Sequence, residues 1–261
     1  MTPATDIRRL FVLLCGYEIL PKTISTRGQG ARFILSEPVC AYLLDTASGW
    51  VLLDAGMNPE NITDPARREA AFGRHGMTPP VIRAPHRLET QLDQIGVRFA
   101  DIGHVILSHL HFDHCGYLGH LRHARISVQR REHAQAFEAD PGVAYIRSDY
   151  DDPAIRWDLR DGDWSAMPGL HLLDTHGHTD GHQSALLHLP GTGPILLPFD
   201  AGDLRENFTQ ELLPGECRDE HAALAAIRRL KRLEHDLGAS MLLFHDPVEI
   251  QQMRLAPEYY D

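Results

Sequence analysis

His109-Leu110-His111-Phe112-Asp113-His114 follows the apolar run Val105-Ile106-Leu107 after a single serine, and this stretch decides the fold. A short apolar run of this kind is typical of a buried strand, so the polar residues lie where that strand ends. On an extended strand end, residues two apart project to the same side, so the first two histidines can converge on one ion. The aspartate and the last histidine follow in the next turn. Imidazole and carboxylate ligands at this spacing suit zinc above other cations, and four such donors predict a site for two ions.

The composition predicts a globular chain with no nucleic-acid or membrane partner. Its 261 residues suffice for one large α/β domain, and no repeat or linker divides them, so we expect a single domain over residues 1–261. A net charge of −11 argues against binding to nucleic-acid phosphates and to anionic membranes. No apolar run approaches the length needed to span a membrane.

The cysteines favour a reducing compartment. Cys15, Cys40, Cys115 and Cys217 are scattered without a Cys-x-x-Cys pair, so neither a disulfide framework nor a thiolate zinc site is indicated. The apolar stretch near the start is too short for an ordinary signal sequence, and no small-residue cleavage site follows it. We therefore expect a cytoplasmic protein in which the thiol beside His114 is a small buried group.

Strand and helix patterns alternate along the chain, as in an α/β fold. Apolar runs bounded by Gly and Pro predict strands at residues 10–14, 32–35, 39–44, 50–54, 104–108, 126–129, 170–174, 184–189, 195–197 and 241–244. Helical patterns cover residues 87–95, 131–138 and 220–237, the last capped by Asp219 and ended by Gly238. Residues 57–84, rich in Pro, Gly and charge, form a long excursion that we interpret as a lid.

Further metal-ligand residues follow other strands or lie in glycine-rich turns. His178 lies in the segment Thr175-His176-Gly177-His178, Asp200 and His245 each follow a predicted strand, and Asp54 follows residues 50–53. Loops at strand ends are where α/β folds assemble their sites. We therefore expect these side chains to join the His109–His114 motif.

The order of these residues resembles that of the metallo-β-lactamase superfamily. The order His-x-His-x-Asp-His, then Gly-His, then Asp, then His runs over nearly the whole chain. The resemblance implies a four-layer αββα sandwich that holds two zinc ions. One ion would be bound by His109, His111 and His178, and the other by Asp113, His114 and His245. Asp200 would bridge the two ions, and Asp54 would orient a ligand histidine by accepting its other N–H.

Within the superfamily, the chain is most similar to the quorum-quenching N-acyl-homoserine lactonases. The matching segments are Ser108 with the histidine motif, Leu53-Asp54-Ala55-Gly56-Met57, the segment from Asp200 to Phe208, and His245-Asp246-Pro247 with the segment Pro257-Glu258-Tyr259-Tyr260. The resemblance implies a small-molecule substrate, whose lactone ring is opened by a hydroxide held between the metals. By this resemblance, Asp113 and Asp200 would be the catalytic carboxylates, with Asp113 placed to move the proton.

Other activities of the same fold remain alternatives. A thioesterase of the glyoxalase II type and a phosphotriesterase use the same ligand pattern, a mononuclear iron persulfide oxygenase is an alternative of another class, and a non-catalytic metal-binding module is a third. The patterns leave the acyl-chain length, the native metal and the oligomeric state open.

Two positions depart from the lactonase pattern. Asp203 stands where these lactonases have a tyrosine that supports the lactone oxygen, and His176 replaces the proline of their Thr-Pro-Gly-His turn. We expect Asp203 to face the substrate and to accept a hydrogen bond from its amide. The remaining candidates for supporting the ligands or touching the substrate are His182, Met57, Phe72 and Met77.

Overall fold

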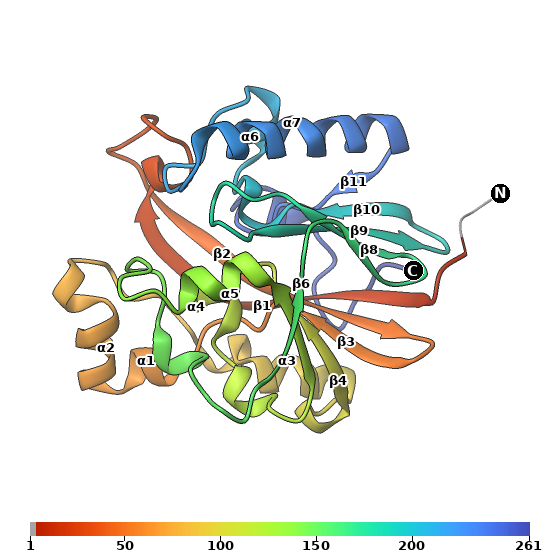
Figure 1. The fold of residues 1–261 in the computed structure, drawn as a ribbon, viewed down its shortest axis with the longest axis horizontal. Coiled ribbons are helices and arrows are strands. Elements are labelled where there is room, and N and C mark those ends of the chain that lie inside the picture. Colours follow the sequence, from red (N-terminus) through yellow and green to blue (C-terminus); the bar gives the residue numbers. More distant parts are fainter. Residues whose placement is uncertain (1–3) are drawn as a thin grey trace.

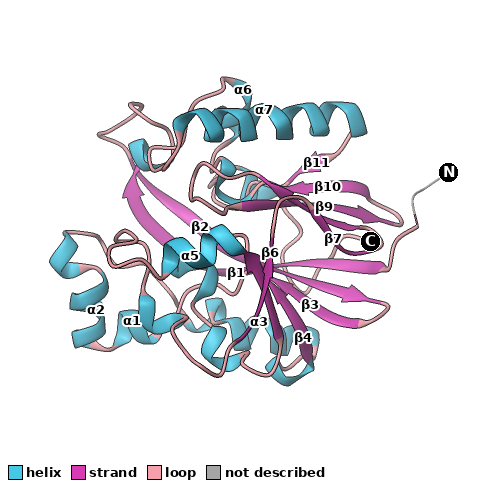
Figure 2. Ribbon diagram, in the orientation of Figure 1, coloured by secondary structure: helices cyan, strands magenta, loops and turns pink. Residues whose placement is uncertain are grey.

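Two β-sheets lie face to face at the centre of the molecule, and helices cover the outer side of each (Figure 1). The computed structural model describes residues 4–261. Figure 2 shows the resulting layers, with α6 and the long helix α7 on one side and α1, α2, α3 and α5 on the other. The predicted four-layer αββα sandwich is confirmed.

The first sheet has the order β1-β2-β3-β4-β5-β6. Its strands β1 to β3 pair antiparallel, and β3 to β6 pair parallel. The antiparallel strands follow one another through turns, whereas each parallel strand needs a longer crossover. The strands span Ile7–Pro21 (β1), Ile34–Thr46 (β2), Gly49–Leu53 (β3), Ile102–Ile106 (β4), Arg125–Gln129 (β5) and Arg156–Arg160 (β6).

The second sheet has the order β11-β10-β9-β8-β7. All of its pairs are antiparallel except β10 with β11. The strands span Trp164–Met167 (β7), Leu170–Asp174 (β8), Gln183–Leu189 (β9), Gly193–Leu197 (β10) and Ser240–Met241 (β11).

The helices occupy the two outer layers and the loops between strands. They span Glu60–Thr63 (α1), Pro65–Ala71 (α2), Leu88–Ile95 (α3), Phe112–Cys115 (α4), Arg130–Ala136 (α5), Arg205–Thr209 (α6) and Glu220–Leu237 (α7). Helix α7 has the predicted bounds, because the Asp219 carboxylate accepts a hydrogen bond from the Ala222 N–H at 3.0 Å and Gly238 takes the left-handed conformation that ends the helix. No helix within residues 4–261 combines the length and apolarity needed to cross a bilayer.

Strand β1 is buried on both faces over residues 10–13, which explains the apolar run there. Phe11 and Leu13 pack into the core under the outer helices, whereas Leu10 and Val12 pack into the core between the sheets. Alternate residues of a strand point to opposite faces, so a strand between two cores needs apolar residues at every position.

Four details of the structure differ from the sequence expectation. Strand β1 continues to Pro21, well beyond residue 14, because the chain keeps its pairing with β2 past a bulge at Leu14 and Gly16. Strands β6 and β7 were not expected, since their partly exposed residues give no apolar run. The last strand, β11, spans only Ser240–Met241, whereas residues 241–244 were expected. Its partner β10 ends just before Pro198, which has no N–H to donate. The excursion over residues 57–84 contains the helices α1 and α2.

Candidate metal centre

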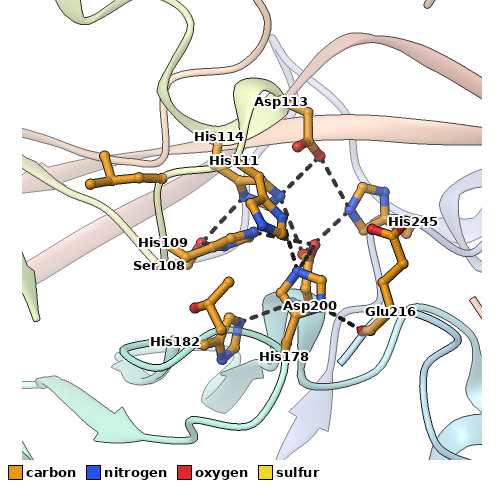
Figure 3. Close-up of polar contacts among 12 residues, drawn as sticks. Ser108, His109, His111, Asp113, His114, His178, His182, Asp200, Glu216 and His245 are labelled. Atoms are coloured by element: carbon orange, nitrogen blue, oxygen red, sulfur yellow. Dashed lines mark hydrogen bonds and ion pairs between the residues drawn. The ribbon is translucent and has the colours of Figure 1, made fainter. Parts of the chain in front are cut away.

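The candidate ligands come together where strands of both sheets end (Figure 3). Beyond β4, His109 and His111 lie in the loop that leads into α4, and α4 itself carries Asp113 and His114. The other three ligands follow the second sheet: His178 lies beyond β8, Asp200 beyond β10 and His245 beyond β11.

The first group comprises His109, His111 and His178. The Nε2 atoms of His109 and His178 lie 3.6 and 3.4 Å from Oδ2 of Asp200. Nε2 of His178 lies 3.1 Å from Nδ1 of His111. The three rings therefore converge on one side of the Asp200 carboxylate.

The second group comprises Asp113, His114 and His245. The Nε2 atoms of His114 and His245 lie 3.3 and 3.4 Å from Oδ1 of Asp200. The same nitrogen atoms lie 2.9 and 3.6 Å from Oδ2 of Asp113. Asp200 thus turns one carboxylate oxygen toward each group, and in each group the candidate ligand atoms, with one from Asp200, lie within 4.8 Å of one another.

The donor atoms fit two cations. All of these ligands except His178 are buried. In the described part of the chain, three buried atoms of the cluster lack a hydrogen-bond partner: His109 Nε2, His114 Nε2 and Asp200 Oδ1. Buried polar atoms normally have hydrogen-bond partners, so three buried atoms of one cluster without partners indicate that a cation binds between them. Imidazole nitrogen with carboxylate oxygen is the ligand chemistry of zinc.

The two groups differ in electrostatics. Burial lowers the pKa of His109 and of His111 well below the usual range, which keeps both rings neutral and able to bind a metal. Burial alone would also lower the pKa of His245, but the carboxylates of Asp200, Asp203 and Asp113 raise it to about 10. The second group is therefore the richer in negative charge.

Asp54 supports the second group directly. Its Oδ2 lies 2.7 Å from Nδ1 of His114 and accepts a hydrogen bond from the Ser108 hydroxyl at 2.8 Å, while its Oδ1 accepts the Ser108 N–H at 2.7 Å. Asp54 has a φ of 57°, a conformation that aspartate tolerates better than most residues. The carboxylate holds the His114 proton on Nδ1 and leaves Nε2 free for a metal.

Other buried partners fix the remaining rings. His178 and His245 direct Nδ1 to the carbonyl oxygens of Glu216 and Pro38, at 3.1 and 3.0 Å. His182 is not among the ligand atoms. Its Nε2 accepts the Asp200 N–H at 3.1 Å, so this neutral ring orients the backbone of the shared aspartate.

The residue before Asp200 is held in a strained conformation. Phe199 has a φ of 49°, which is unusual for a bulky side chain. Its ring is buried and packs edge-on against Tyr42 and Phe244, with ring centroids 5.9 and 6.3 Å apart. The core therefore imposes the turn that directs Asp200 toward both groups.

A cavity of about 420 Å³ opens above the two groups. The far end of the β1–β2 hairpin contributes most of its apolar wall, and residues 76–78 and 143–144 contribute the rest. Its lining contains the apolar side chains Ile19, Leu20, Pro21, Ile24, Ile34, Met77, Phe112 and Val143 and the acidic side chains Glu18, Glu37, Asp113, Asp200, Asp203 and Glu216.

The excursion over residues 57–84 contributes fewer residues to the cavity than expected. Met57 and Phe72 do not line this cavity, because both are buried in the core under the first sheet, where Phe72 packs against Phe112 at 5.3 Å. Met77 does line it. Apolar side chains occur both in a core and in a cavity wall, so the sequence alone did not distinguish core residues from cavity residues.

Asp203 lies in the cavity wall. Burial and the neighbouring Asp200 carboxylate raise the pKa of Asp203 well above its usual range. Arg205 is not its partner, because that guanidinium pairs with Glu249 at 2.7 Å and with Glu234 at 3.1 Å. Glu18 and Glu37 stand in the same wall and were missed, since they interrupt β1 and β2 without any motif.

Comparison with known proteins agrees with this geometry. A family model of the metallo-beta-lactamase superfamily matches residues 37–237. The chain is 34% identical over 243 residues to N-acyl homoserine lactonase AttM of Azorhizobium caulinodans, a match that covers 90% of this chain and 91% of that protein. It is 31% identical over 257 residues to an N-acyl homoserine lactonase of Bacillus cereus, covering 97% and 99% of the two chains.

A solved structure of an N-acyl homoserine lactone hydrolase is similar over 100% of both chains, with 30% identity and a TM-score of 0.89. That structure holds the product N-hexanoyl-L-homoserine at its catalytic metal centre. The predicted resemblance is thereby confirmed.

Proposed function

The chain belongs to the metallo-beta-lactamase superfamily, and from that membership we propose that it opens the lactone ring of N-acyl homoserine lactones. One observation carries the proposal: Asp200 presents one oxygen to each of two three-ligand groups at the floor of a partly apolar cavity. Its lactonase relatives, similar over nearly the full chain, support the choice of substrate.

We assign one zinc ion to each group, with Asp200 shared. His109, His111 and His178 would hold one ion, and Asp113, His114 and His245 the other. Zinc bound in this way polarises a carbonyl group and supplies a nucleophile at neutral pH. His182 and Asp54 support these ligands and take no part in the bond changes.

Asp113 is the residue placed to move the proton. Its side chain lies in the cavity lining, and its Oδ2 reaches both imidazoles of the second group. Opening the ring breaks the ester C–O bond and adds one water, giving a carboxylate, an alcohol and one proton released to solvent. Asp113 takes the proton from the water and returns it to the departing alcohol oxygen.

The cavity wall favours a neutral substrate with an apolar tail. Among the described residues that line it, none is a lysine or an arginine, and six are acidic. A glutathione thioester carries carboxylates that this wall would repel, which disfavours the thioesterase alternative. The apolar residues of the β1–β2 hairpin instead suit an acyl chain.

Asp203 would recognise the amide of the substrate. A carboxyl oxygen accepts a hydrogen bond in either protonation state, and the amide N–H of an acyl homoserine lactone is a matching donor. This contact would replace the support that related lactonases draw from a tyrosine at this position.

The test is pH-stat hydrolysis of a series of lactones, with a thioester and a phosphotriester as controls. We expect turnover of acyl homoserine lactones at least roughly tenfold faster than of either control, because the wall is built for a neutral acyl amide. Close to two zinc equivalents should copurify. Faster turnover of the thioester or phosphotriester, or one tightly bound redox-active iron, would contradict the proposal.

We also infer a single hydrolase domain over residues 1–261 that works in the cytoplasm. In the described chain all four cysteines are free, and three of them are buried. Such thiols persist most readily in a reducing compartment. Cell fractionation with activity in the cytosolic fraction tests the inference, and activity confined to another fraction contradicts it.

A further inference from the structure

Glu132 is a buried carboxylate that the proposed reaction does not use. It lies in the first turn of α5, and its side chain is fully buried, with 0% exposed. No lysine, arginine or histidine in residues 4–261 forms a salt bridge with it. A buried carboxylate without a cation is costly unless hydrogen bonds satisfy it.

Four hydrogen bonds converge on this carboxylate. Oε1 accepts the Leu110 N–H at 2.9 Å and the Tyr145 hydroxyl at 2.8 Å. Oε2 accepts the Thr179 hydroxyl at 2.5 Å and the Gly181 N–H at 3.3 Å. An amide side chain has one acceptor oxygen, so only a carboxylate accepts all four donors on two oxygens.

Every donor belongs to the surroundings of the first group. Leu110 stands between His109 and His111, and Thr179 directly follows His178. The Tyr145 ring lies edge-on against His111, with ring centroids 4.7 Å apart. A single carboxylate therefore joins the loop after β4 to the loop after β8, which together supply the three imidazoles.

The close approach of α5 to the second loop is independent of these hydrogen bonds. A Cβ atom on Gly181 would lie 2.2 Å from the backbone nitrogen of Glu132. Only glycine allows the loop to lie this near the start of α5. The contact brings Glu132 within reach of Thr179 and keeps it there.

We propose that Glu132 is a positioning residue that fixes the separation of the two loops and thereby sets the metal affinity of the first group. The inference rests on the proposed two-metal site. It predicts that loss of Glu132 weakens one metal-binding step and leaves the other, because the second group draws its support from Asp54.

The test measures zinc affinity step by step, by competition with a chromophoric chelator and without any lactone. In Glu132→Ala, one step should weaken by roughly 10- to 100-fold, the usual effect of losing a residue that supports metal ligands, while the other changes less than about threefold. In Glu132→Gln the amide oxygen can keep the bonds from Leu110 and Tyr145, and the Thr179 hydroxyl can rotate to accept. That variant should lose only about three- to tenfold at the same step.

Asp149 provides a matched control. It is another buried carboxylate, and it accepts neutral donors, the side-chain amides of Asn58 and Asn61 at 2.8 and 2.7 Å. It contacts neither group of ligands. Asp149→Asn and Asp149→Ala should lower the melting temperature and leave both zinc affinities unchanged.

Unchanged zinc affinities in both Glu132 variants would overturn the inference, as would equal losses at both steps. If Glu132→Ala does not fold, the contrast between Glu132→Gln and Asp149→Asn decides. A chain that binds two zinc ions but hydrolyses no lactone would contradict the proposed function and leave the role of Glu132 standing.

Discussion

The first and second groups share Asp200 but are supported in different ways. In the second group, Asp54 touches a ligand ring itself, at 2.7 Å from Nδ1 of His114. In the first group, Glu132 touches no ligand ring and holds the loops through Leu110, Thr179 and Tyr145. A direct contact fixes the tautomer of one ring, whereas an indirect contact fixes the distance between two loops. The same kind of side chain therefore performs a chemical task in one half of the site and a geometric task in the other.

The largest effect should come from the residue that both groups share. Asp200→Ala removes a ligand from each group, so turnover should fall by roughly a thousandfold or more, since each metal supplies several kcal/mol of catalysis. Lactone hydrolysis and zinc content measure the change. Asp236→Ala, on the exposed end of α7, is the control and should keep full activity. If Asp200→Ala retained both zinc ions and full activity, Asp200 would not be a ligand shared by the two groups.

The second group should respond most strongly to Asp54→Asn, because Asp54 contacts His114 directly and reaches His109 of the first group only through the Ser108 hydroxyl, which lies 2.9 Å from Nδ1 of His109. The amide keeps an oxygen for the Ser108 N–H but turns an NH₂ group toward Nδ1 of His114. The His114 proton is then driven to Nε2, the atom that faces the metal. Zinc affinity at the second group should fall by about 10- to 100-fold, at the step that the Glu132 variants leave intact. If both substitutions weaken the same step, the two supports are not separate.

Asp203→Tyr tests the cavity wall that both groups face. A tyrosine hydroxyl can donate a hydrogen bond to a developing oxyanion, so simple lactones without an amide should be hydrolysed up to about tenfold faster. Selectivity for the acylated substrate should fall, because the acceptor for its amide is gone. The ratio of kcat/KM for the two substrate types measures this. Equal effects on both types would place Asp203 outside the substrate contact.

His104 lies on β4, the strand that leads to ligands of both groups. Its contribution to stability should therefore be the same for the two groups. Burial lowers the pKa of His104 to about 4, below its unfolded value of about 6.5. The unfolded chain therefore binds a proton first, and stability present above pH 6.5 is lost as the pH falls toward 4. The free energy of unfolding should drop by about 2 kcal/mol between pH 7 and pH 5 from this residue.

Urea unfolding of the protein and of His104→Gln at both pH values isolates that contribution. The variant should lose about 2 kcal/mol less than the protein over this interval, and both metal affinities at pH 7 should stay unchanged. An identical pH dependence in the two proteins would show that His104 is not the responsible group.

Two histidines outside both groups should have the smallest effect on turnover. His120 is exposed, so His120→Ala should keep activity within about twofold. His133 is half-buried against Phe137 and Trp157, with ring centroids 4.6 and 5.0 Å away. His133→Ala should therefore cost about 1 kcal/mol of stability and leave turnover intact. A large loss of turnover in either variant would indicate a further ligand.

The supports also differ in how far the sequence predicts them. Asp54 follows an apolar strand, as Asp200 does, and an acidic residue at a strand end is a recognisable signal. Glu132 gives no such signal, because glutamate in the first turn of a helix is common for electrostatic reasons alone. Its role depends on loops 22 and 47 residues away in the chain, which only the fold brings together.

The same reasoning applies to the fold and the cavity. Strands that carry a buried apolar run, such as β3 and β10, were predicted, whereas the partly exposed β6 and β7 were not. Glu18 and Glu37 become cavity residues because the β1–β2 hairpin extends over the metal groups. How far a hairpin extends is set by pairing between its strands, and no local pattern in β1 records it.

The left-handed conformation of Phe199 has a consequence for the order of events in assembly. Holding a bulky residue there costs roughly 1–3 kcal/mol, and the packing of its ring against Tyr42 and Phe244 offsets that cost when the chain folds. Asp200 is therefore aimed before any ion arrives. The aromatic core already sets the orientation of Asp200, so a metal bound by this carboxylate would not have to bend the backbone.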